Sequence, residues 1–117
     1  MVIVYNKLVR DKIPDIIEEL GGRTEWMTIE DTHDYREALR LKLLEEIEEF
    51  SNSNISNLEE MSDVCEVLKA IAKINGWTFK NIDNAMKNKV KENGSFNDKK
   101  FLVFVDKKME YEDDYEV

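Results

Sequence analysis

Apolar residues recur with a helical period through most of the chain, between short polar segments that carry helix-start and helix-stop residues. Asp11 and Pro14 are typical of a helix start, and Gly21 is typical of a helix end. A capping-box pattern at residues 56–59 and the glycines Gly76 and Gly94 mark other boundaries in the same way. We predict four helices, over residues 11–20, 31–50, 56–75 and 78–93. The sequence therefore favours a mainly α fold, an antiparallel helical bundle of about four helices.

Three stretches have the apolar character and the length of β-strands instead, at residues 2–5, 24–29 and 101–105. We expect them to form a small β element from the termini and the 24–29 segment. No linker long enough to separate domains occurs before residue 105. We therefore predict a single helical domain over 1–105, followed by an acidic tail over 106–117.

The acidic residues of the second and third predicted helices lie on apolar faces. Leu39, Leu43 and Phe50 form a buried stripe, and Glu46 falls on it while Glu49 flanks it.

The third predicted helix repeats this arrangement: Glu60 lies within about 20° of the apolar Val67 around the helix axis, and Asp63 within about 40°. Because a short loop joins these two helices, they should be antiparallel, and the two acidic pairs could face one another.

Four carboxylates forced together need a counter-charge, because like charges and burial both penalise the ionised form. Residues 45–66 hold eight acids and no Lys or Arg. A hard divalent cation such as Mg²⁺, which prefers oxygen ligands, would resolve the conflict, whereas an all-oxygen set argues against zinc or a di-iron site. A solvated acidic face is the alternative for any single glutamate, and Glu48 and Glu66 fit it.

The formal net charge is −9, with eight acids in residues 45–66 and six acids against two lysines in 106–117, so the remaining residues carry a small positive charge. This balance argues against a nucleic-acid polymer as partner. A single cysteine, Cys65, no signal peptide and no apolar run of about 18 residues indicate a cytoplasmic protein outside the membrane. We expect Cys65 to be a small buried residue.

The run KLLEEIEE at 42–49, followed by EMSD at 60–63, resembles the Glu-Glu-x-x-Glu and Glu-x-x-Asp signature of the MazG-like, all-α nucleotide pyrophosphohydrolases. The opening YNKLVRDKIP at 5–14 is similar to that of the branch labelled phosphoribosyl-ATP pyrophosphohydrolase-like. Gly94-Ser95-Phe96 resembles a Gly-Gly-Phe that follows the last helix of the family. The resemblance covers nearly the whole chain up to Phe104.

The resemblance implies Mg²⁺-dependent hydrolysis of an aberrant or surplus nucleoside triphosphate between the α and β phosphates, with Mn²⁺ as a substitute metal. It implies metal binding by Glu46, Glu49, Glu60 and Asp63. Glu45 would be the catalytic residue that orients or deprotonates the attacking water. The family also implies a homodimer or a higher homo-oligomer, a state that the apolar Leu41 and Leu44 favour too.

Four basic residues are candidates for binding the substrate's phosphates: Lys7, Arg10, Lys12 and Lys89. From their spacing alone, the first three fit equally well as solvent-exposed residues that precede or open the first helix. Lys89 corresponds to a basic residue of the family, but Asn93 stands where the family has an Arg. Two alternatives stay open. One is phosphoribosyl-ATP hydrolysis in histidine synthesis, and the other, motivated by Asn93, is a catalytically degenerate module for nucleotide sensing or protein association.

Overall fold

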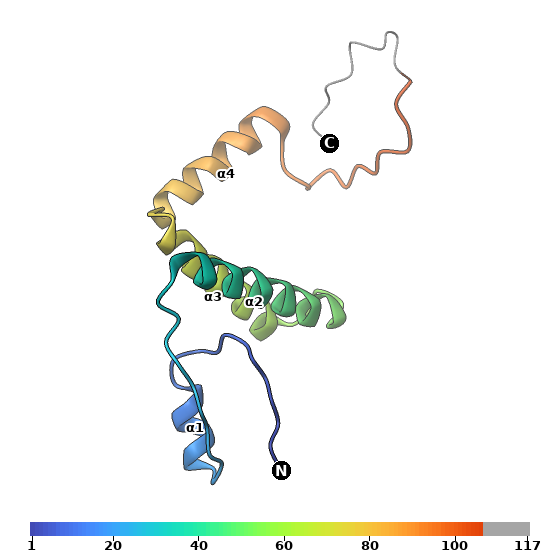
Figure 1. Cartoon of the computed structure of the whole chain (residues 1–117). Coiled ribbons are helices and arrows are strands. Elements are labelled where there is room, and N and C mark those ends of the chain that lie inside the picture. Colours follow the sequence, from blue (N-terminus) through green and yellow to red (C-terminus); the bar gives the residue numbers. More distant parts are fainter. Residues whose placement is uncertain (107–117) are drawn as a thin grey trace. The chain divides into compact units, whose positions relative to one another are not determined.

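The computed structural model describes residues 1–106 and contains four helices in that range (Figure 1). They are α1 (Ile13–Glu19), α2 (Thr32–Asn52), α3 (Leu58–Ile74) and α4 (Phe79–Asn93). This confirms the prediction of a mainly helical chain with four helices. The chain divides into two units, Met1–Phe79 and one that begins at Lys80. The single domain over 1–105 stays a prediction, and each unit is described by itself.

Side-chain caps fix where the two long helices begin. The Asp31 side chain accepts a hydrogen bond from the backbone N–H of Asp34 at 2.9 Å, and Asn57 accepts one from Glu60 at 3.1 Å. Each cap satisfies a backbone donor that the first helical turn leaves without a partner. The predicted capping box at residue 56 is therefore wrong by one residue. Asp11 does not cap α1 either, because Lys12 occupies the N-cap position without a side-chain hydrogen bond.

Glycines end α1 and α3 in the predicted places. Gly21 has φ of 95° and Gly76 has φ of 72°, a left-handed backbone that a side chain would disfavour. Just after Gly76, the N–H of Trp77 bonds to the carbonyl of Ala72 at 2.9 Å, which satisfies one of the last carbonyls of α3. The helix boundaries are thus determined by local sequence.

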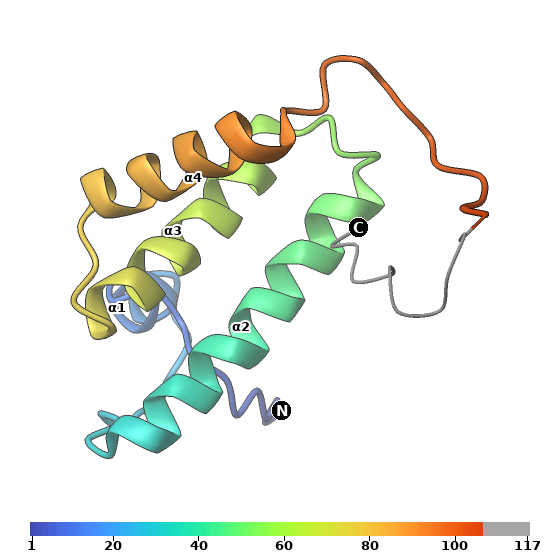
Figure 2. The ribbon, with the colours of Figure 1, turned by 90° about the horizontal axis from the view of Figure 1, so that it is seen from above.

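Helices α2 and α3 form an antiparallel hairpin that is connected by residues 53–57 (Figures 1 and 2). At its open end, Arg36 near the start of α2 donates a hydrogen bond to the side chain of Asn75 after α3, at 3.1 Å. This arrangement confirms the antiparallel packing expected from the short loop. It also brings the acidic segments of the two helices onto the same seam.

The apolar core of the described residues is small and lies on this seam. Leu39 is 2% exposed, and Val67 and Ala72 are the other buried apolar residues. Glu46, the one buried charged residue within 1–106, is 8% exposed and lies on the predicted stripe with Leu39. Burial of Cys65, in contrast, was a wrong expectation, because its side chain is exposed.

The expected β element is not present in the described part of the chain. Residues 2–5, 24–29 and 101–105 form no strand. A strand exists only through hydrogen bonds to a partner strand, and an apolar pattern by itself supplies no partner. The apolar pattern was right that these segments are not helical, but the expectation that they pair as β-strands was wrong.

None of the helices in residues 1–106 combines the length and the apolar character that crossing a bilayer requires. The predicted acidic tail lies outside the described residues, except for Asp106.

Candidate metal centre

Helices α2 and α3 bring together three of the four predicted metal ligands. One carboxylate oxygen from each of Glu46, Glu49 and Glu60 lies within 4.8 Å of the other two. Glu46 and Glu49 are neighbours on one face of α2 because they are three residues apart, and Glu60 lies in the first turn of α3. These three residues are called the carboxylate cluster below. Glu46 is buried, Glu60 is half-buried and Glu49 is exposed, so the cluster reaches from the helix seam to solvent.

Two oxygens of the cluster are buried without a hydrogen-bond partner: Oε2 of Glu46 and Oε2 of Glu60. An unpartnered carboxylate oxygen is costly to bury, since it loses its hydration without compensation. A divalent cation of the Mg²⁺ or Mn²⁺ type takes such oxygens as ligands. The donor set, which contains no thiolate or imidazole, therefore fits a hard cation and does not resemble a zinc site.

A lysine on the same helix partly neutralises the cluster. Lys42 Nζ lies 3.3 Å from Oε1 of Glu46 and 3.4 Å from Oε2 of Glu45. Lys42 lies just before residues 45–66, the stretch without Lys or Arg, and was not among the counter-charges expected from the sequence. The i to i+4 spacing between Lys42 and Glu46 was the signal that could have revealed it.

The surroundings shift the pKa values of the adjacent Glu45 and Glu46 in opposite directions. Burial raises the pKa of Glu46, while Lys42 opposes this effect and the charges of Glu49 and Asp63 add to it. The hydrogen bond from Lys7 lowers the pKa of Glu45, against a smaller opposing effect of burial. Burial thus opposes ionisation of Glu46 even though Lys42 lies beside it, whereas Lys7 favours ionisation of Glu45.

The segment before α1 supplies two further cations to the same region. Lys7 Nζ lies 2.6 Å from Oε1 of Glu45, and Arg10 Nη2 lies 2.7 Å from Oδ1 of Asp63. The pKa of Lys7 is raised, chiefly by its hydrogen bond to Glu45. Asp63, the fourth predicted ligand, is thus bound to Arg10 and lies outside the cluster.

The other two predicted phosphate-binding residues lie elsewhere in the chain. Lys12 occupies the N-cap position of α1, and Lys89 is an exposed residue of α4 in the second unit. Neither belongs to the carboxylate cluster.

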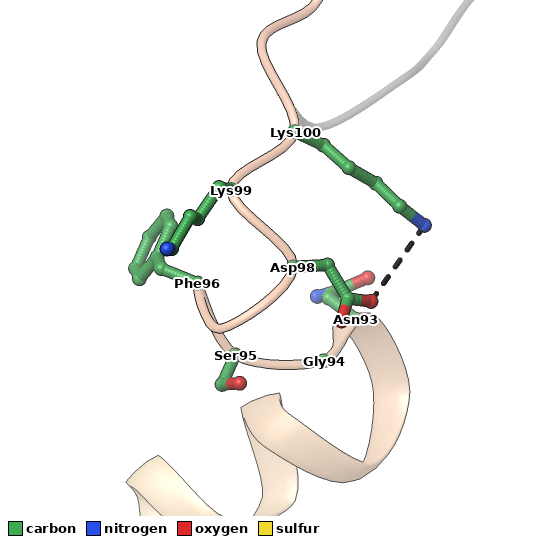
Figure 3. Close-up of a pocket in the computed structure, with 7 residues that line it drawn as sticks. All are labelled: Asn93, Gly94, Ser95, Phe96, Asp98, Lys99 and Lys100. Atoms are coloured by element: carbon green, nitrogen blue, oxygen red, sulfur yellow. Dashed lines mark ion pairs between the residues drawn. The ribbon is translucent and has the colours of Figure 1, made fainter.

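A pocket follows α4 and includes the Gly94-Ser95-Phe96 segment (Figure 3). Asn93, Asp98, Lys99 and Lys100 complete its lining, and Lys100 Nζ lies 3.9 Å from an oxygen of Asp98. Figure 3 shows the side chains of Lys99 and Phe96 on the opposite side of this loop from Lys100. Among the described residues, the one group of possible metal ligands is the carboxylate cluster, and it includes none of the residues that line this pocket.

No protein-family model, curated protein or solved structure matches the chain. The function is therefore argued from the geometry of the carboxylate cluster and from the motifs that it contains.

Replacing Glu60 with Gln should weaken the binding of Mg²⁺ or Mn²⁺ by about tenfold or more, because even residues that only support a metal ligand contribute that much. Isothermal titration calorimetry measures the change. Glu59→Gln is the matched control, since it removes the same charge one residue earlier and lies outside the cluster. Equal weakening by both variants would contradict a direct role for Glu60.

Proposed function

We propose that the chain is a divalent-cation-dependent pyrophosphohydrolase that cleaves a nucleoside triphosphate between its α and β phosphates. The observation that carries the proposal is the carboxylate cluster, which has two buried oxygens without partners. The cluster coincides with the two acidic half-motifs whose pattern resembles the MazG-like family. A solvated acidic face would not require Glu46 to be buried at the helix seam.

In this proposal Glu46, Glu49, Glu60 and Asp63 hold the cation, which is Mg²⁺ or, as a substitute, Mn²⁺. When bound, the cation neutralises phosphate charge and lowers the pKa of water at the site. The acidic cluster then becomes compatible with a polyanionic substrate. The negative net charge of the chain is therefore no obstacle to a phosphate-containing substrate.

Glu45 would direct the attack of a water molecule on the α phosphorus of the substrate. Glu45 is next to the ligand Glu46, and both of its oxygens are engaged by lysines, Oε1 by Lys7 at 2.6 Å and Oε2 by Lys42 at 3.4 Å. Glu45 thus has a fixed orientation and can accept a hydrogen bond from the attacking water. The water oxygen bonds to the α phosphorus while a proton of the water passes to Glu45 and from there to solvent. The bond from that phosphorus to the bridging oxygen breaks, and pyrophosphate leaves with that oxygen and the electron pair of the bond.

Purified protein should release pyrophosphate from at least one nucleotide of a nucleoside triphosphate panel, and only when Mg²⁺ is present. Glu46→Gln should lower the rate by roughly tenfold to a hundredfold, since it removes a charged ligand. Glu48→Gln is the matched control because Glu48 is exposed and lies outside the cluster.

No turnover of any nucleotide, with no difference between Glu46→Gln and the wild type, would refute the proposal. Two other results would favour the two alternative functions. Nucleotide binding without product indicates a degenerate module, and turnover of phosphoribosyl-ATP alone indicates a step of histidine synthesis.

We also propose that the chain works as a homodimer or a higher homo-oligomer. Leu41, Leu44 and Ile47 leave about half of their surface exposed along α2, and Met61 and Leu68 do the same along α3. Apolar surface of this extent is unusual for a monomer and favours association with a second copy.

Light scattering at micromolar concentration should therefore give a mass of two or more 13.8 kDa chains. Leu44→Glu should shift the mass toward the monomer, because it places a charge on this apolar surface. A monomeric wild-type protein would contradict the proposed assembly.

A further inference from the structure

Asp63 lies beside the carboxylate cluster but is bound to a different partner. It is three residues after Glu60 on α3, so the two side chains share a helix face. Its Oδ1 accepts a hydrogen bond from Arg10 at 2.7 Å across 53 residues of sequence. The only described basic partner of Asp63 thus comes from the segment before α1.

The pair between Arg10 and Asp63 is open to solvent. The Arg10 side chain is 53% exposed and that of Asp63 is 38% exposed. An exposed ion pair contributes little to stability, since water competes with it and two side chains must be held in one geometry. Asp63 can therefore exchange Arg10 for a stronger partner at small cost.

The neighbouring cluster still lacks positive charge. Glu46 is more than nine-tenths buried, and its Oε2 has no partner. Lys42 and Lys7 reach Glu46 Oε1 and Glu45 but leave that oxygen unsatisfied. A cation that binds beside this oxygen is also attracted by the negative charge of Asp63. Arg10 opposes its binding, because the guanidinium already occupies Asp63 and carries a positive charge of its own.

We propose that Arg10 and a divalent cation compete for the carboxylate of Asp63. The inference rests on the proposed function, because it concerns the cation of that same site. Arg10 balances the charge of Asp63 when the cation is absent. Cation binding frees the guanidinium, whose planar set of donors suits a phosphate group. Binding of the cation therefore makes Arg10 available to bind a phosphate group of the substrate.

A double-mutant cycle tests the competition by calorimetric titration with Mn²⁺ and with Mg²⁺, in the absence of nucleotide. Arg10→Gln should tighten cation binding roughly two- to fivefold, the range expected for the loss of one exposed ion pair. In the Asp63→Asn background the same substitution should leave the affinity unchanged, because the carboxylate for which the two cations compete is gone.

Two controls separate local competition from other effects. Arg40→Gln removes the same charge from α2, where Arg40 pairs with Glu37 at 2.6 Å, and it should not reproduce the tightening. Arg10→Lys keeps a cation opposite Asp63 and should bind Mn²⁺ less tightly than Arg10→Gln does. Circular dichroism verifies that each variant keeps its helix content.

Weaker or unchanged binding in Arg10→Gln would overturn the inference, and so would equal tightening in both backgrounds. These outcomes leave the proposed hydrolysis intact, because pyrophosphate release is measured separately. Absence of cation binding in the wild type and in every variant would instead overturn the metal dependence of the proposed function, and this inference with it.

Discussion

Carboxylates and apolar side chains share the seam between α2 and α3, so the charge at this seam has to be balanced. Packing α2 against α3 buries Leu39 and Val67, and the same faces carry Glu46 and Glu60. The hairpin therefore gains apolar burial only by bringing carboxylates together. Burial and mutual repulsion both oppose their ionisation, so the fold needs positive charge at that place. Lysine and arginine supply part of it, and two buried carboxylate oxygens remain without a partner.

The basic residues next to the site follow from the same constraint. Lys42 contacts Glu45 and Glu46 from within α2, whereas Lys7 and Arg10 reach the carboxylates from the segment before α1. These contacts connect a segment with few buried residues to the best-packed part of the first unit. Residues that the sequence associated with substrate phosphates are thus also the counter-charges of the acidic site. In the proposed enzyme Arg10 alternates between these two roles with occupancy by the cation, while Lys7 continues to orient Glu45.

Local sequence was enough to predict the helices, because caps and glycines act within a few residues. Asp31 and Gly76 mark helix ends as expected, and the stripe through Leu39 correctly placed Glu46 at the seam. The β element could not be predicted, since pairing depends on where distant segments meet. The ion pair of Arg10 with Asp63 was missed for the same reason, and the exposure of Cys65 depends on which face of α3 meets α2.

A crystal structure grown with Mn²⁺ shows whether a divalent cation completes the charge balance between α2 and α3. We expect an anomalous difference peak coordinated by oxygens of Glu46, Glu49, Glu60 and Asp63, with Arg10 turned away from Asp63. A structure at saturating Mn²⁺ in which these carboxylates contact only lysine, arginine and water would contradict this expectation.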